Sequence, residues 1–304
     1  MLDKIKSFKY PFVMFLAGCC YGFLVPLVRV AGDEGFSTGQ MMVTQYIYTL
    51  AILFVVTVAF IRARIRVRQV FQLIALGVLL SSVSLFYYNA LQMLPSSTAL
   101  TLLFQFSWIG VVIQIIMERK PPRPIVIVAV VVIFVGTFFA TGILPAGAGV
   151  LQGLNVVGVL CGLAAAVTYA IYITVSGRFA KGVPALERSM FTSIGNFILG
   201  FIVCPTYFAT STFIDLGWLG FALGFVGILL PLVLIAISSP HLSAGTSTIM
   251  AASELPAGII CAAAIMGDAI SVTVVLGVVL VLVGIVMSQV RLPLQGKTGD
   301  TGIR

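Results

Sequence analysis

The chain has 304 residues, of which 60% are hydrophobic and 9% charged, with a mean hydropathy of +1.17. Soluble domains contain about 25% charged residues, so a water-facing surface cannot be built from this composition, and a soluble globular protein is excluded. The net charge of +8 does not indicate nucleic-acid binding, because the basic residues form short clusters between apolar runs, without a basic stripe interleaved with aromatic residues.

The predicted elements are apolar runs, each long enough to cross a bilayer, which takes about 20 residues. The first run follows a basic segment but lacks a small-residue cleavage site, so we interpret it as a membrane helix and not as a signal peptide. Short connections predict one all-α membrane bundle. The ten predicted transmembrane helices are 10–30, 38–61, 69–92, 97–117, 124–143, 153–177, 185–208, 216–238, 244–267 and 270–290.

Lysine and arginine orient these helices, because cytoplasmic loops are enriched in both. With ten helices, Arg29 is the one basic residue of the 17 that does not fall on the side of the two termini. The other basic residues lie before the first helix, in the 62–68 run, in the 119–123 loop, in the 178–188 region and in the tail. We therefore predict a multi-pass protein of the cell (inner or plasma) membrane, with cytoplasmic N- and C-termini.

An internal repeat divides the chain into two halves of five helices. Because five is odd, the second half must start on the opposite side of the membrane, which predicts two inverted repeats, a recurrent transporter architecture. The alternative is a duplicated scaffold without a transport role. We predict a first repeat at 1–147, a second at 148–291 and a cytoplasmic tail at 292–304. A shift of 148 residues places Tyr21-Gly22 on Tyr169-Ala170, Gln40 on Arg188, and Val135-Gly136 on Val283-Gly284.

The repeated pairs resemble motifs of the drug/metabolite transporter superfamily, specifically its EamA-type ten-helix members. An aromatic-small pair opens each half of that family, as Tyr21-Gly22 does here, and the fifth helix carries an apolar-Gly pair such as Val135-Gly136. The fourth helix of the second half is also similar, with Glu254-Leu255-Pro256 followed by Gly267-Asp268. The resemblance implies a membrane transporter, and among relatives the chain is similar to amino-acid and metabolite exporters.

The chain departs from the family pattern at three places. Ser107-Trp108 stands where proline is common, Asp268 replaces the usual glutamate, and Gln45 stands where many members have arginine. The sequence also shows no membrane-embedded Lys or Arg of the kind that the resemblance implies for phosphate-sugar antiporters.

Glu254 is the only acidic residue deep within a predicted helix. A carboxylate in hydrocarbon is costly, so it usually faces a cavity and often binds protons. We predict that Glu254 couples transport to protons or binds a substrate amine, and the alternative is a structural hydrogen bond from a protonated acid. Pro26, Pro231 and Pro256 lie inside helices, where proline bends the backbone and frees a carbonyl. They predict kinks with a gating role or simple packing kinks.

Polar and aromatic residues of other helices predict the rest of a substrate-binding site. Several recur at helical spacing and so share one face of their helix, among them Ser84 with Tyr88, and Thr101 with Gln105. Such faces on several helices indicate a shared, partly hydrated interior, although they also serve as packing contacts. The predicted substrate-binding residues are Glu254, Tyr88, Trp108, Gln105, Ser84, Thr101, Tyr172, Asn196 and Gln45.

Cysteine and histidine give no sign of a metal site. The five cysteines lie in apolar runs without ligand spacing, and the only histidine, His241, falls in a short connection. The sequence lacks a phosphate-binding loop of the G-x-x-x-x-G-K-[ST] type. We therefore predict no cofactor, no metal and no catalytic residues. The predicted partners are a small-molecule substrate and the lipid bilayer, and the predicted state is a monomer or weak homodimer that binds no nucleic acid.

Together these patterns predict a secondary active transporter, an exporter, of small polar or zwitterionic metabolites such as amino acids. Transport would proceed by alternating access around a central cavity. One alternative is a membrane-embedded lipid-modifying enzyme, which usually needs a constellation of His, Asp and Ser or a metal. The other is a channel, which often uses rings of charge or a carbonyl filter.

Overall fold

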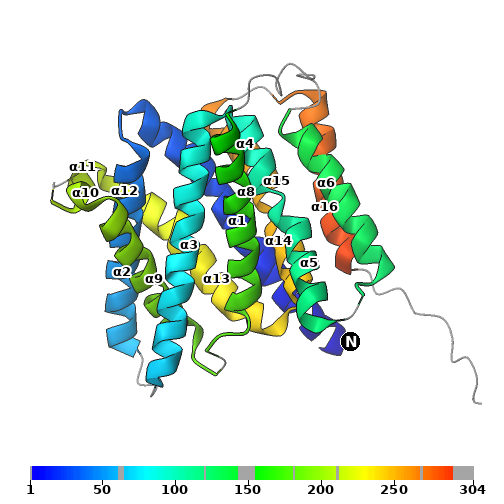
Figure 1. Cartoon of the computed structure of the whole chain (residues 1–304), viewed down its shortest axis with the longest axis horizontal. Coiled ribbons are helices and arrows are strands. Elements are labelled where there is room, and N and C mark those ends of the chain that lie inside the picture. Colours follow the sequence, from blue (N-terminus) through cyan, green and yellow to red (C-terminus); the bar gives the residue numbers. More distant parts are fainter. Residues whose placement is uncertain are drawn as a thin grey trace, which may run out of the picture.

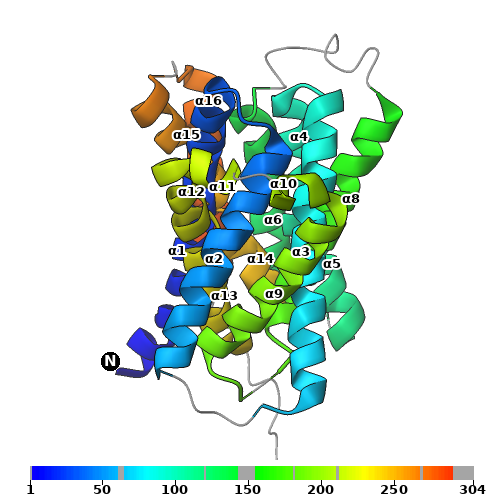
Figure 2. The ribbon, with the colours of Figure 1, turned by 90° about the vertical axis from the view of Figure 1, so that its left-hand side faces the viewer.

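The computed structural model describes residues 2–60, 65–119, 121–142, 155–180, 182–209, 212–267 and 270–289. Within these residues the regular structure is helical, with no strand. The helices run side by side in one bundle (Figures 1 and 2). Asp268, the tail at 292–304 and parts of the segments 62–68, 119–123 and 178–188 lie outside the described ranges.

Long apolar helices dominate the described part of the chain, and the predicted class of all-α membrane protein is confirmed. Eight stretches are long and apolar enough to cross a membrane, and Pro124–Ala140 is a shorter apolar helix. The chain is therefore a multi-pass membrane protein, while the count of ten spans stays a prediction. The eight stretches are Phe8–Asp33, Thr38–Ala59, Val67–Met93, Ser96–Glu118, Val156–Ser176, Gly217–His241, Ala244–Met266 and Val272–Gln289.

Three of these stretches are broken into shorter helices. The stretch at Ser96–Glu118 holds α4 and α5, and the stretch at Ala244–Met266 holds α14 and α15. The third stretch, Gly217–His241, contains a π-helical turn, η2. The helices are α1 (Leu2–Asp33), α2 (Thr38–Phe60), α3 (Val67–Met93), α4 (Ser96–Leu103), α5 (Phe106–Glu118), α6 (Pro124–Ala140), α8 (Val156–Ser176), α9 (Ala185–Val203), α10 (Pro205–Ala209), α11 (Thr212–Asp215), α12 (Gly217–Gly224), η2 (Phe225–Leu229), α13 (Leu230–Ser238), the 3₁₀ turn η3 (Ser239–His241), α14 (Ala244–Ala251), α15 (Glu254–Met266) and α16 (Val272–Gln289).

The helix boundaries repeat along the chain at the offset found in the sequence. Both ends of α4 and both ends of α5 recur 148 residues later as the ends of α14 and α15. The residues that cap α5 and α15, Arg119 and Gly267, both adopt a left-handed backbone. The first residue of α6, Pro124, likewise corresponds to Val272, the first residue of α16. The segment from α4 to the start of α6 therefore has the same series of local structures as the segment from α14 to the start of α16.

Helix packing follows the same repeat. The helix α3 packs against α8, as α13 packs against α1, and corresponding helices meet in the pairs α2–α9, α5–α14 and α6–α16. The α6–α16 pair lies at one edge of the bundle, whereas α2, α9 and α12 lie at the opposite edge (Figure 1). Most of the helices that carry the predicted site pack between these edges, and α2 and α9 contribute Gln45 and Asn196 from one of them.

Glycine allows the closest helix crossing. A Cβ atom added to Gly77 of α3 would overlap the backbone oxygen of Thr192 in α9, and Gly195 of α9 faces the same crossing. Small residues let helix backbones approach in membranes, where apolar burial alone does not drive helices together. This crossing fixes α3 beside α9, and both helices contribute to the site described next.

Candidate substrate-binding site

Glu254 lies at a break near the middle of the stretch Ala244–Met266. It is the first residue of α15, and the break at Ala252 and Ser253 separates it from α14. Pro256 follows in the first turn of α15, where it cannot donate the N–H that a continuous helix would direct at the carbonyl of Ala252. That carbonyl accepts from the backbone of Leu255 at 3.3 Å instead. The backbone therefore turns from one helix into the next at the position of the buried acid.

Four aromatic side chains pack together beside Glu254, with Tyr169 in contact with the other three. The hydroxyl of Tyr169 donates a hydrogen bond of 3.2 Å to Oε2 of Glu254. The Tyr169 ring packs on Phe106 at 4.6 Å between centroids, meets Tyr21 edge-on at 6.2 Å and lies parallel to Tyr172 at 6.4 Å. We call these five residues the aromatic centre. The four rings are buried, whereas Glu254 as a whole residue keeps partial exposure.

A second polar cluster joins α2, α3 and α9. The Ser81 hydroxyl bonds to Tyr46 Oη at 3.0 Å and to the backbone oxygen of Asn196 at 3.4 Å. The side-chain amides of Gln45 and Asn196 are buried, and none of their four oxygen and nitrogen atoms has a hydrogen-bond partner within the described residues. A buried polar group without a partner costs about 1–3 kcal/mol, so such groups commonly serve a ligand or a water molecule.

Two tyrosines connect this cluster with the aromatic centre. Tyr88 lies beside the amide of Gln45, and its ring is 6.3 Å from that of Tyr87, which in turn interacts electrostatically with Glu254. Ser84 lies beside the hydroxyl of Tyr46. The structure thus brings most of the predicted binding residues into two adjoining clusters.

The remaining predicted binding residues form a separate group on α4 and α5. Thr101 bonds to the Thr141 hydroxyl at 2.7 Å, and Gln105 donates to the backbone oxygen of Thr101 at 2.7 Å. Trp108 donates to the amide oxygen of Gln105 at 2.8 Å. Trp108 is 37% exposed and shares a helix side with Ile116, which is 70% exposed. In the described residues, these hydrogen bonds join the group to itself and to α6, not to Glu254.

The other two predicted kink prolines lie in different settings. Pro26 is buried within α1, which continues through it from Leu2 to Asp33. Pro231 begins the last segment of its span directly after the π-helical turn η2. A π-helical turn is one of the known ways to accommodate a helix irregularity, often at functional sites.

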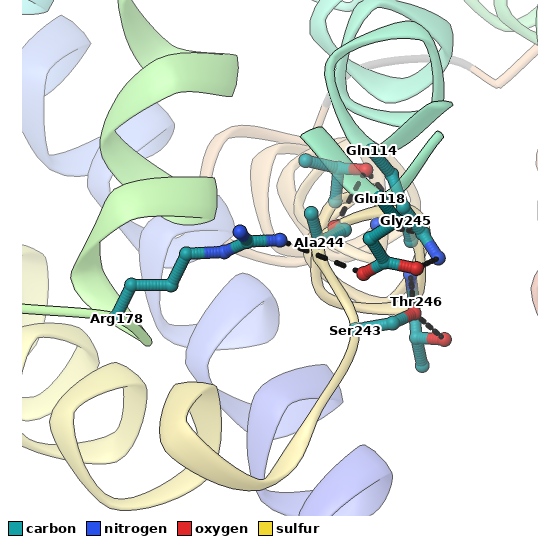
Figure 3. Close-up of polar contacts among 8 residues, drawn as sticks. Gln114, Glu118, Arg178, Ser243, Ala244, Gly245 and Thr246 are labelled. Atoms are coloured by element: carbon teal, nitrogen blue, oxygen red, sulfur yellow. Dashed lines mark hydrogen bonds and ion pairs between the residues drawn. The ribbon is translucent and has the colours of Figure 1, made fainter. Parts of the chain in front are cut away.

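A polar network joins the two halves at one end of the bundle (Figure 3). Arg178, just after α8, pairs with Glu118 at the end of α5, with 3.5 Å between Nη2 and Oε1. The Gln114 amide donates to Glu118 at 2.9 Å and accepts from the backbone N–H of Gly245 at 2.8 Å. Both charged side chains are more than a third exposed, so the pair itself contributes only about 0–1 kcal/mol.

Arg188 is the functional candidate that the sequence analysis missed. It lies within the predicted helix 185–208 but was counted only among the basic residues that orient the helices. The structure places it in the first turn of α9, where it is 4% exposed. Its guanidinium donates to the backbone oxygen of Ala236 at 2.9 Å and to that of Ser176. The spacing of Arg188, Thr192 and Asn196, four residues apart on one helix face, was a signal that would have placed it in the bundle.

Together, the long apolar helices, the broken span and the buried polar centre define a multi-pass helical membrane protein with an interior polar site. Residues 9–142 and 156–289 each match the sequence profile of the EamA-like transporter family. The chain therefore belongs to the EamA-like transporter family, which confirms the resemblance stated above and identifies it as a membrane transporter. The double match agrees with the repeat of helix boundaries.

A solved structure, described as "Crystal structure of protein", shares this fold. It superimposes with a TM-score of 0.73 at 18% sequence identity, covering 92% of this chain and 98% of the other. At this identity the likeness shows the fold alone. A search of curated proteins finds no significant match.

Proposed function

We propose that this protein is a secondary active transporter that exports small polar or zwitterionic metabolites, such as amino acids, by alternating access around a central cavity. The observation that carries the proposal is Glu254 at the break between α14 and α15. In membrane transporters, broken helices commonly lie at the substrate site near the bilayer midplane. An acid at such a position suits the binding of a substrate amine, a proton, or each in turn.

The surroundings of Glu254 support this role. Its hydrogen-bond partner is the Tyr169 hydroxyl, and no basic side chain of the described residues forms a salt bridge with it. A carboxylate without a protein cation, partly exposed in the core, leaves room for a cation from outside the protein. The tyrosine rings around it offer faces on which an ammonium group or an aromatic side chain can rest.

The rest of the proposed site extends from Glu254 in two directions. Tyr172, Tyr88 and Ser84 would contact the substrate, and the unpartnered amides of Gln45 and Asn196 would bond its polar groups. Thr101, Gln105 and Trp108 would belong to the site through the break between α4 and α5, which corresponds to the break at Glu254. We propose that the helices bend at Pro26, Pro231 and Pro256 during the transport cycle.

We further propose ten spans in two inverted repeats, with cytoplasmic termini, in the inner or plasma membrane. Helix boundaries that recur 148 residues apart support the repeat, and the one-sided distribution of lysine and arginine supports the orientation. On this proposal the network of Arg178, Glu118 and Gln114 lies at the cytoplasmic end. The state would be a monomer or weak homodimer.

Transport assays test the proposal directly. The purified protein is reconstituted in liposomes, and uptake of a panel of amino acids and amines is measured with and without a pH gradient. We expect concentrative, gradient-dependent uptake by the wild type, and loss of at least about nine tenths of it in Glu254→Gln, as expected when a charged hydrogen-bond partner is removed. Glu118→Gln, the same change at an exposed acid, is the matched control and should transport normally.

Three results would contradict the proposal. Uptake by Glu254→Gln equal to wild type at every pH and for every substrate would remove the role of Glu254. Equilibration without accumulation would indicate a channel, and conversion of a lipid to a new product would indicate an enzyme.

A further inference from the structure

Arg188 is a buried cation whose protein partners are neutral. It is 4% exposed, and its guanidinium donates to the backbone oxygens of Ala236 and Ser176. In the part of the chain that the structure describes, no carboxylate pairs with it. Burial of an unpaired charge is costly, and carbonyl groups at helix C-termini, although favourable to a cation, are weaker partners than a carboxylate.

The guanidinium also has an unused donor. The Nε atom of Arg188 is buried and has no hydrogen-bond partner within the described residues. Arginine binds carboxylates through a planar fork of two parallel N–H donors, and Nε supplies one arm of this fork. Arg188 therefore retains an arm for an anionic group although its terminal nitrogens are occupied.

A small cavity of mixed lining lies against Arg188. Its polar side is formed by Tyr172 and Ser176 of α8 with Arg188, Ser189 and Thr192 of α9, and apolar side chains of α3 and α13 form the rest. Its volume of about 10 Å³, measured for the centre of a water molecule, is enough for roughly one water. In this conformation the cavity is closed to a carboxylate-bearing metabolite, and it would have to widen as α8, α9 and α13 separate.

One face of α8 connects this cavity with the Glu254 site. Tyr169, Tyr172 and Ser176 follow spacings of three and four residues, so they share that face. Tyr169 bonds to Glu254 at one end, and the Ser176 carbonyl accepts from Arg188 at the other. Seven residues of helix span about 10 Å, too far for both groups to hold the amine and carboxylate of one α-amino acid at once. The two sites would therefore be used in succession.

We propose that Arg188 is a second binding point, which takes the carboxylate of the substrate between the Glu254 site and the end of the bundle marked by Arg178 and Glu118. A carboxylate on Nε and one terminal nitrogen of Arg188 would compete with one of the two carbonyls, that of Ser176 or that of Ala236, which belong to the last turns of α8 and α13. Carboxylate binding would thus weaken the link that the shared cation makes between these two helix ends. This inference rests on the proposed function. It requires that the substrate carry a carboxylate as well as the amine that would bind Glu254.

Matched pairs of probes test the inference. L-phenylalanine and L-leucine carry an amine and a carboxylate, whereas their amides carry the amine alone. In proteoliposomes we expect Arg188→Gln to raise KM for both acids about tenfold or more, as for a lost hydrogen bond to a charged group, and to leave KM for both amides unchanged. Glu254→Gln should impair acids and amides alike. Gln40→Ala, at the corresponding position of the first half, is the control and should change neither.

The outcomes separate this inference from the proposed function. If the wild type carries amides but not acids, or if Arg188→Gln affects acids and amides equally, Arg188 is a structural clamp and the inference is wrong, while the transporter remains. If the wild type transports none of the amine-bearing probes, both the inference and the proposed function are wrong. Size-exclusion chromatography and thermal unfolding monitor folding of each variant. Should Arg188→Gln misfold, Arg188→Lys keeps the charge without the fork, and unchanged KM values for the acids would then overturn the inference.

Discussion

The two broken spans have the same backbone and different chemistry. In the first half, the break between α4 and α5 carries Gln105, whose amide bonds within its own span, next to the buried ring of Phe106. In the second half, the corresponding residues are Ser253, which donates to the backbone oxygen of Phe15 in α1 at 2.7 Å, and Glu254, which meets Tyr169 of α8. The polar side chain of the first break bonds within its own span, whereas those of the second break bond to other helices. A duplicated scaffold can thus keep its geometry while only one copy carries an acidic side chain at the break.

The first turns of α2 and α9 show the same division. Gln40 accepts from the backbone N–H of Ser37 at 2.7 Å and so caps its own helix. The side chain of its counterpart, Arg188, extends away from α9 and donates to backbone oxygens of α8 and α13. Among the described residues, the charged side chains of the core, Glu187, Arg188 and Glu254, all belong to the second half, so changes at corresponding sites should have unequal effects.

The largest effect is expected at the glycine crossings. In Gly77→Ala the new methyl would overlap the backbone of α9, which cannot yield, so we expect a loss of about 3 kcal/mol or more, at the upper end for overpacking. Gly224→Ala, at the related crossing of the second half, should cost less, because the nearest atom, Cβ of Tyr48, is 2.7 Å from the new methyl and the overlap is smaller. Gly32→Ala meets only the end of Met41, at 3.9 Å, and is the control. Thermal unfolding in detergent measures the series, and equal losses at all three glycines would contradict it.

The next effect compares the two breaks. We expect Glu254→Gln to reduce uptake at least about tenfold, whereas Gln105→Ala, which removes a hydrogen bond between neutral groups, should reduce it only about threefold. Initial rates in proteoliposomes give both values. A greater loss in Gln105→Ala would place the functional centre in the first half instead.

Two corresponding tyrosines should respond differently to the loss of their hydroxyl. Tyr169→Phe removes the hydrogen bond to Glu254, and we expect uptake to fall roughly five- to tenfold. Tyr21→Phe removes a buried hydroxyl that has no hydrogen-bond partner in the described residues, so stability should rise or stay the same and uptake should be unchanged. Equal loss of uptake in the two variants would show that the hydrogen bond to Glu254 has no special role.

The smallest effect is expected where the halves meet at the surface. Glu118→Gln weakens the pair with Arg178, both partners being more than a third exposed, so we expect a loss of about 0–1 kcal/mol. Thermal unfolding at low and at high salt measures it, because salt screens exposed charge pairs. A loss well above this range, insensitive to salt, would show that the network of Gln114 and Glu118 holds the halves together through its hydrogen bonds.

The sequence predicted the helices well and the contacts between them poorly. Long apolar runs define spans almost by themselves, because lipid leaves the backbone few alternatives to a helix. The break at Ser253 had a local signal in Pro256, whereas the break at Gln105 has no proline nearby and went unpredicted. Arg188 was interpreted only as a basic residue that orients the helices, so its burial in the bundle was not predicted. The bond between Tyr169 and Glu254 depends on how α8 packs against α15, which spacing along one helix does not encode.

The unpartnered amides of Gln45 and Asn196 have a consequence for selectivity. A solute without hydrogen-bonding groups would displace water from them and offer nothing in return, at a penalty of about 1–3 kcal/mol for each amide atom left bare. Sites built to bond polar groups reject analogues that lack those groups more strongly than apolar pockets reject analogues of a different size. On the proposed function, these two buried amides would therefore select against apolar solutes such as lipid chains.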